Sequence, residues 1–315
     1  MSGLTNRRVL LPVLALASIG ALLAGCAQEP AATASSAPAA SSAAASAAPA
    51  ESAAPAASAS AAPELTACSK ENLTLVTPGT LTIGTDTPAY PPYFSDDDPS
   101  NGEGFESAVA YAVADGLGFA PNEVTWATVP FNSSYAPGDK AFDFDINQIS
   151  ITPKRQKVVD FSNGYYTVNQ AVIALKDSPI ANATTLAELQ AAKLGAQIGT
   201  TSLDFINEVV QPADQPYVYN DTNDAKSALQ NGQIDGIVVD LPTAYDITAV
   251  EIPKGKIVGQ FKAQEGGEQF GLLFAKGNPL VSCVNEVIDG LAASGELQSI
   301  QDEWLAGDVA PYFTE

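Results

Sequence analysis

Short runs in which apolar and polar residues alternate are separated by longer amphipathic runs. Leu81–Thr85 alternates and predicts a strand, and Val124–Val129 and Phe142–Ile146 predict two more. Phe105–Leu117 places its apolar residues on one face of a helix. Thr152-Pro153 predicts the start of a short helix, because proline is favoured at the first helical position. This order of elements predicts an α/β unit with a mostly parallel sheet.

The same rhythm continues through the second half of the chain, without a convincing internal repeat. The expected strands are Gln170–Leu175, Ala196–Ile198, Tyr217–Tyr219, Ile237–Val239 and Gln269–Ala275. The expected helices are Thr185–Ala191, Ser202–Val210, Asn223–Leu229, Leu280–Ala293 and Leu297–Leu305. The globular part, about 250 residues from position 65 onward, is large for one core and natural for two lobes.

The first 25 residues have the pattern of an export signal. Arg7 and Arg8 precede the apolar run Val9–Leu23, which is shorter than the roughly 20 residues that span a membrane. The run closes on small residues directly before Cys26, which predicts a signal peptide over residues 1–25. This ending resembles a bacterial lipobox, so we expect Cys26 to be lipid-modified and to anchor the mature chain to the membrane. The alternative is an ordinary secretory signal followed by a chance cysteine.

Residues 26–64 have a composition that cannot form a core. They are almost all alanine, serine and proline, and Glu29 and Glu51 are the only charges within residues 28–63. We interpret them as a disordered tether that lifts a folded unit off the membrane.

Charge and composition exclude several classes of function. Removing the leader takes away 2 of the 14 basic residues and none of the 36 acidic ones, so the net charge goes from −22 to −24. Such a chain is a poor partner for nucleic acid. It has no histidine, which excludes His-based acid–base catalysis and His-ligated metals, and we expect neither a metal nor a cofactor. Cys68 and Cys283 predict a disulfide in an exported protein, with a reactive pair as the alternative.

Arg155 is the only arginine after the leader, in the stretch FDFDINQISITPKRQKVVDFS. Its planar fork of donors matches a carboxylate in a way that lysine does not. Ser150 and Thr152 can add hydroxyl donors beside it. The alternative is a solvated arginine on a surface turn.

Ten short motifs, each weak alone, occur in order. They are LTIGTD with YPPY (Leu81–Tyr93), GEGFE (Gly102–Glu106), VPF (Val129–Phe131), FDFDINQISITPKR (Phe142–Arg155), VDFS-GYY (Val159–Tyr166), IGTTS (Ile198–Ser202), NGQIDGIVVDLPTAY (Asn231–Tyr245), FGLLFAKGNPL (Phe270–Leu280), CVNEVIDGL (Cys283–Leu291) and SGELQSIQDEWL (Ser294–Leu305). Together they resemble the extracellular solute-binding proteins of family 3, which feed amino-acid ABC importers. Two stretches depart from the family: Glu106 stands where an aspartate is common, and Asn132–Tyr135 lacks the usual apolar residues.

The resemblance implies a two-lobe periplasmic-binding-protein fold of type II. Residues 65–167 and 269–315 would form the first lobe and residues 168–268 the second. Crossing segments near Thr167–Gln170 and Gln264–Gln269 would form the hinge, and a ligand would be enclosed in the cleft between the lobes.

The resemblance also assigns ligand-binding residues. Arg155 would take the carboxylate of an amino acid and Asp240 its ammonium group, because either charge is costly to bury unpaired. The other expected contacts, from both lobes, are Ser150, Gln148 and the backbone near it, Thr200, Thr201, Tyr90, Asp86 and Phe131.

Several of these residues have simpler alternatives. Thr201-x-x-Asp204 has the spacing of a capping box that serves only its own helix. Asp240 could cap a helix that begins at Pro242. Asp86 could meet a basic side chain or could only fix its own loop. Aromatic residues such as Tyr90 and Phe131 are often core residues. Asn147 and Gln148 favour a ligand with a polar end.

The expected function is the extracytoplasmic, lipid-anchored binding component of an amino-acid ABC importer. It would be a monomer that captures a free amino acid and docks on a membrane permease, with no covalent chemistry. One alternative is an amino-acid-binding sensor lipoprotein without a transport role, which unchanged uptake in a deletion strain would favour. Another is a dehydratase-like enzyme on the same fold, which turnover of a prephenate-like substrate would favour.

Overall fold

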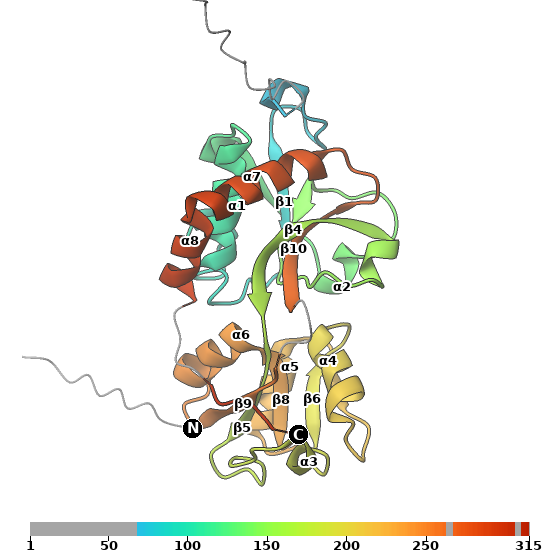
Figure 1. Cartoon of the computed structure of the whole chain (residues 1–315), viewed down its shortest axis with the longest axis vertical. Coiled ribbons are helices and arrows are strands. Elements are labelled where there is room, and N and C mark those ends of the chain that lie inside the picture. Colours follow the sequence, from blue (N-terminus) through green and yellow to red (C-terminus); the bar gives the residue numbers. More distant parts are fainter. Residues whose placement is uncertain (1–67, 263–266, 306–309, 315) are drawn as a thin grey trace, which may run out of the picture. The chain divides into compact units, whose positions relative to one another are not determined.

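The computed structural model describes residues 68–262, 267–305 and 310–314 (Figure 1). The predicted signal peptide, Cys26 and the tether 26–64 lie outside the described residues. Within the described part, none of the helices has both the length and the apolar character needed to cross a membrane.

The first lobe is built on a five-stranded sheet. Its strands, in spatial order, are β2 (Val124–Thr128), β1 (Leu81–Thr85), β3 (Phe144–Asp145), β10 (Glu268–Ala275) and β4 (Val159–Val168). Its helices are α1 (Phe105–Gly116), α2 (Phe131–Ser134), α7 (Leu280–Ser294) and α8 (Glu296–Trp304). Helices α1, α7 and α8 pack against one another beside this sheet (Figure 1). Their apolar faces meet Phe144, Phe270 and Phe274 of the strands in one buried core.

The second lobe has its own five-stranded sheet. Its strands, in spatial order, are β7 (Tyr217–Tyr219), β6 (Leu194–Gln197), β8 (Gly236–Asp240), β5 (Gln170–Leu175) and β9 (Gly255–Gln260). Its helices are α3 (Leu186–Leu189), α4 (Thr201–Phe205), α5 (Thr222–Gln230) and α6 (Leu241–Asp246).

Strand β5 shows how this sheet divides its core. Val172 and Ala174 pack in a cluster with Leu189 of α3, whereas Ala171 and Ile173 pack in a second cluster with helices α5 and α6. Successive side chains of a strand point to opposite faces of the sheet, so a strand covered on both faces is apolar at every position.

Short helical turns complete the described secondary structure. They are Lys70–Asn72, Pro99–Asn101, Pro121–Glu123 and Arg155–Lys157, with wider turns at Ile206–Val210 and Ile247–Glu251. The short helix predicted from Thr152-Pro153 is therefore only a single turn, because strand β4 starts at Val159. The helix predicted over Ser202–Val210 is α4 followed by a wider turn.

The expectation of mostly parallel sheets is wrong. In each sheet two neighbouring pairs of strands are parallel and two are antiparallel. The antiparallel pairs all involve β10 in the first sheet or β5 in the second. Both of these strands start where the chain passes from one lobe to the other, and they enter their sheets against the direction of the βα units.

The chain crosses between the lobes at Asn169, between β4 and β5, and again between β9 and β10. It also returns to the second lobe at its end. Gln260 of β9 pairs with Tyr312, and the Phe313 ring lies 5.0 Å from that of Phe261 within the core of the second lobe (Figure 1). The predicted assignment of residues 269–315 to the first lobe is thus wrong for residues 310–314. This tail has no periodic pattern, so only its packing assigns it.

The predicted disulfide is confirmed. Cys68 and Cys283 are bonded, with their Cα atoms 5.3 Å apart and a sequence separation of 215 residues. The bond ties the segment before β1 to helix α7. A loop of this length corresponds to about 5 kcal/mol of stabilisation in the chain-entropy account.

Candidate functional site

Residues of both lobes enclose a small cavity of about 70 Å³. It lies where β1, β3, β6 and β8 end, as expected for a site at the carboxyl ends of parallel strands. Its walls contain seven of the nine predicted ligand-binding residues, namely Asp86, Tyr90, Phe131, Gln148, Thr200, Thr201 and Asp240. Ser150 and Arg155 are the two that do not line it.

Asp240 ends strand β8 and lies half-buried in this cavity wall. It precedes helix α6, but its carboxylate makes no capping hydrogen bond to that helix. Instead Oδ1 accepts a 2.7 Å hydrogen bond from Nε2 of Gln170. Burial and the neighbouring Glu268 carboxylate raise the pKa of Asp240 well above its usual range, against the opposing effects of Gln170 and Arg155. Among the described residues, no cation forms an ion pair with Asp240.

The hydroxyl groups of Ser150 and Thr201 meet across the lobes at 3.3 Å. Thr200, rather than the predicted Thr201, caps helix α4, since its Oγ1 accepts from the backbone N–H of Leu203. The capping box predicted from Thr201 and Asp204 is therefore wrong. Thr201 does not cap the helix, and its hydroxyl faces that of Ser150. These two residues form the Ser150–Thr201 wall, at the edge of the small cavity that Thr201 lines.

Arg155 lies on the other side of this wall and is only 6% exposed, so it is not a solvated surface residue. Its guanidinium donates to the carbonyl oxygens of Ser150 (2.8 Å) and Gly199 (2.9 Å), one from each lobe. The rings of Phe131 and Tyr135 lie 5.4 and 4.8 Å from its central carbon. Among the described residues no carboxylate forms an ion pair with it. A buried cation that bonds only to carbonyls favours the approach of an anion.

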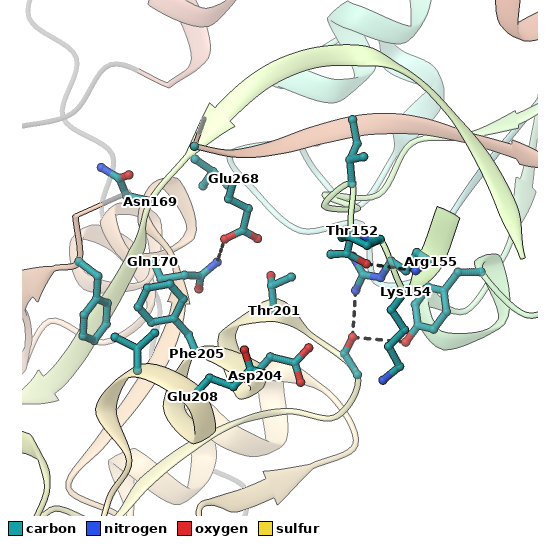
Figure 2. Close-up of a pocket in the computed structure, with 18 of the residues that line it drawn as sticks. Thr152, Lys154, Arg155, Asn169, Gln170, Thr201, Asp204, Phe205, Glu208 and Glu268 are labelled. Carbon is teal, nitrogen blue, oxygen red and sulfur yellow. Dashed lines mark hydrogen bonds between the residues drawn. The ribbon is translucent and has the colours of Figure 1, made fainter. Parts of the chain in front are cut away.

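A second, larger cavity of about 1030 Å³ opens beside Arg155 (Figure 2). Four basic side chains line it, namely Lys154, Arg155, Lys157 and Lys262. Three acidic side chains also line it, namely Asp204, Glu208 and Glu268. Phe205 and Phe261 supply an apolar part of its wall.

Gly199 allows the lobes to approach closely here. Its φ of +77° lies in the left-handed region, and a Cβ atom at this position would collide with Asn132 and Tyr135 of the first lobe. Asn132 and Tyr135 belong to the stretch that departs from the family pattern. The Tyr135 hydroxyl donates to the Gly199 carbonyl oxygen of the second lobe (3.4 Å) and to Oδ1 of Asn132 within the first lobe.

Asp86 holds its own loop and also lines the small cavity. Its oxygens accept from the backbone N–H groups of Thr87 (2.7 Å) and Phe131 (3.1 Å). The ring of Tyr90 lies 5.3 Å from the ammonium of Lys226 in the second lobe. The predicted alternatives for Asp86 are thus compatible, because one carboxylate can order a loop and still face a ligand.

Gln148 contributes less to the cavity than expected. Its backbone N–H donates to Oε1 of Glu106 (2.7 Å) and its side-chain amide donates to Oε2 of the same residue. The N–H of Gln148 itself is thus already used by Glu106, and contact between the ligand and the backbone near Gln148 stays a prediction. Burial raises the pKa of Glu106 to about 7, although the Tyr165 hydroxyl and Gln148 oppose the shift. Glu106 stands where an aspartate is common in the family. It therefore holds Gln148, a residue that lines the small cavity.

Apart from Asn147, the other residues around the site were not singled out by the sequence as ligand contacts. The small cavity is also lined by Asn147, Gln197, Ser202, Thr222, Val238, Val239 and Thr243. Gln170, Glu268 and Tyr135 contact the predicted residues from the hinge strands and from the loop after α2. Gln170 and Glu268 lie near the ends of the predicted crossing segments. This position is the one feature of the sequence from which they could have been predicted as site residues. In the part of the chain that the structure describes, no group of three or more Cys, Asp or Glu residues is placed to hold a metal ion.

The chain is similar to amino-acid-binding proteins in both sequence and structure. It is 30% identical over 234 residues to the L-cystine-binding protein TcyJ of Escherichia coli, a match that covers 73% of this chain and 84% of the relative. It is 26% identical to the arginine-binding extracellular protein ArtP of Bacillus subtilis, over 72% of this chain and 87% of that protein. An ancestral arginine-binding protein bound to arginine superimposes with a TM-score of 0.61 and 28% identity, over 72% of this chain and 99% of that one.

The family model of the bacterial extracellular solute-binding proteins, family 3, matches residues 81–307. These residues include both sheets and every residue of the two cavities. The chain belongs to the bacterial extracellular solute-binding proteins, family 3.

Proposed function

We propose that the chain captures a free amino acid between its lobes and delivers it to an ABC permease in the membrane. The observation that carries this proposal is the placement of an acid, Asp240, in the small cavity and of a buried base, Arg155, in the large cavity, on opposite sides of the Ser150–Thr201 wall. Among the described residues no cation forms an ion pair with Asp240 and no carboxylate forms one with Arg155. The ammonium and carboxylate groups of an amino acid would supply both missing partners.

Binding of this kind requires no chemical step. Contacts to both lobes favour a closed arrangement, because the ligand gains its full set of partners only when the lobes meet. We therefore propose a binding protein rather than an enzyme, acting as a monomer. A sensor lipoprotein with the same cleft remains the second candidate, and unchanged amino-acid uptake after deletion of the gene would favour it.

The cavity suggests a ligand with a polar end. Asp86 and Asn147 line it together with the hydroxyl of Thr222, so a basic or amide side chain would find partners there. Arginine and cystine, which appear in the names of the relatives, are the first ligands to compare with the neutral amide glutamine.

A thermal-shift screen across the standard amino acids and cystine tests the proposal. A ligand at 100 times its Kd contributes about 2.7 kcal/mol, which corresponds to a rise in Tm of roughly 5–10 °C for a protein of this size. Asp240→Asn removes the charge that faces the ammonium group and should abolish the rise. Asp214→Asn, at an exposed position of the same lobe, should leave it unchanged. If no amino acid raises the Tm of the wild-type protein, the proposal is wrong.

We also propose that Cys26, outside the described residues, anchors the mature chain through acyl groups. The Cys26→Ser protein should be released from membranes into the medium or periplasm. Retention of this variant in the membrane fraction would contradict the anchor without affecting the binding proposal.

A further inference from the structure

The strands on which the chain crosses between the lobes carry a hydrogen-bonded chain of polar side chains. Gln170 is the first residue of β5, and Glu268 is the first residue of β10. Nε2 of Gln170 donates to Oδ1 of Asp240 (2.7 Å) and to Oε2 of Glu268 (3.0 Å), a contact drawn in Figure 2. The Gln170 carbonyl oxygen accepts from Ser202 Oγ at 2.7 Å. Every polar group of this buried amide is therefore used.

Glu268 continues this chain into the first lobe. Its Oε1 accepts a 2.5 Å hydrogen bond from Ser150 Oγ, the hydroxyl that also meets Thr201. The Glu268 carboxylate is thus held by one residue of each lobe, and it lies on the strand that joins them. A change in the angle between the lobes would pull at least one of these two bonds apart.

The two acids are close enough to influence each other. Glu268 is the strongest charged contributor to the raised pKa of Asp240, and it also acts on Arg155. The groups that face Asp240 from the surrounding elements are Gln170, Glu268, Glu106, Arg155, Tyr93 and Tyr166. Glu268 is the only one of these, among the described residues, that hydrogen-bonds both Gln170 and Ser150.

We propose that Glu268 is a positioning residue for the ammonium group of the ligand, in addition to the residues that line the small cavity. Through Gln170 it holds Asp240, and through Ser150 it ties that acid to the first lobe, so the acidic end of the site is assembled only when the hinge strands are correctly placed. Its charge also adds to that of Asp240 in attracting a cation. This inference rests on the proposed amino-acid function.

Glu268→Gln separates charge from packing. The new carbonyl oxygen can accept from Gln170 and the new amide can donate to Ser150 Oγ, so both contacts can persist while the charge is lost. Glu296→Gln is the matched control, because it makes the same exchange at an exposed position at the start of α8 that lines neither cavity. Titration calorimetry with the amino acid found in the screen gives Kd for each protein across a range of pH.

We expect Glu268→Gln to weaken binding about tenfold near neutral pH. Asp240 must be ionised to hold an ammonium group, so wild-type affinity falls as the pH drops through the pKa of Asp240. Loss of the neighbouring negative charge lowers that pKa, and the acid midpoint of binding should move to lower pH. A purely structural effect would lower the affinity equally at every pH. Glu296→Gln should change neither quantity.

Gln170→Met provides a second variant that leaves Glu268 intact. It removes the amide that favours the ionised form of Asp240, so its acid midpoint should move to higher pH, opposite to that of Glu268→Gln. Far-UV circular dichroism establishes that each variant is folded, and either variant alone is sufficient for the measurement. Acid midpoints equal to that of the wild-type protein would overturn the inference. A wild-type protein that binds no amino acid would instead overturn the proposed function.

Discussion

The small and large cavities share one wall but differ in charge. Asp86 and Asp240 are the only charged residues that line the small cavity in the described part of the chain, and both are acidic. Four basic residues line the large cavity, including Arg155, in a chain with a net charge of −22. Thr201 lines both cavities, and its hydroxyl meets that of Ser150 between them. In the proposed function, the two ends of one ligand would therefore be recognised from separate cavities, with Asp240 in one and Arg155 in the other.

Replacing Arg155 has the largest expected effect on this division. Arg155→Ala should weaken amino-acid binding by at least about 100-fold, because a ligand carboxylate would be buried without its partner. Arg155→Lys should recover only part of the loss, since lysine lacks the planar fork. Lys193→Ala, at an exposed position that lines neither cavity, is the control and should stay within about twofold. Calorimetry measures all three, and undiminished affinity of Arg155→Ala would contradict the division.

The next prediction concerns Glu106, which accepts a hydrogen bond from Gln148 in the wall of the small cavity. Its pKa is about 7 in the folded protein and about 4.5 ordinarily, so the folded state holds the proton to higher pH than the unfolded chain. Its contribution to the free energy of unfolding is therefore full below about pH 4.5 and is lost as the pH rises through about 7, a change of about 3 kcal/mol. Urea unfolding near pH 5 and pH 8 should show a smaller pH dependence for Glu106→Gln than for wild type. If the free energy of unfolding depended on pH equally in both proteins, the buried Glu106 carboxyl would not be the cause of that dependence.

The wall itself is tested by a double-mutant cycle. Ser150→Ala and Thr201→Val should each weaken binding by roughly fivefold to tenfold, as expected for the loss of a neutral hydrogen bond. Because the two hydroxyls bond to each other, the double variant should lose less than the product of the single losses. Strict additivity of the two binding free energies would mean that the hydroxyls do not act as one wall.

Asp86 gives the smallest effect and sharpens the ligand preference of the small cavity. Asp86→Asn keeps an acceptor for the loop but loses the charge, so affinity for arginine should fall about threefold. Affinity for glutamine, the comparison ligand, should change little. Equal losses for both ligands would assign Asp86 only to its loop.

Much of the fold could be predicted because the apolar pattern records burial directly. The sequence predicts Leu81–Thr85, Gln170–Leu175 and Tyr217–Tyr219 with the bounds of β1, β5 and β7. Strands β4 and β9 were not predicted. Polar residues and a glycine interrupt the alternation in β4, and β9 begins and nearly ends with glycine. Both pair with a crossing strand, and that pairing depends on distant parts of the chain.

The candidate site was predicted in its residue types but not in its arrangement. Asp240 and Arg155 stand out in the sequence, the first after an apolar strand and the second as the only arginine beyond the leader. Their neighbours Gln170 and Glu268 do not, because a glutamine and a glutamate at strand starts are ordinary surface residues until two lobes close over them.

The sequence by itself determined the two α/β units, the disulfide between Cys68 and Cys283, and the acidic and basic residues suited to an amino acid, because burial, redox chemistry and charge are properties of local residue type. Tertiary structure alone decided that Arg155 and Asp240 lie in different cavities, that Thr200 rather than Thr201 caps its helix, and that Phe313 belongs to the second lobe. These facts depend on contacts between residues far apart in the chain, and no local pattern encodes the distance between them.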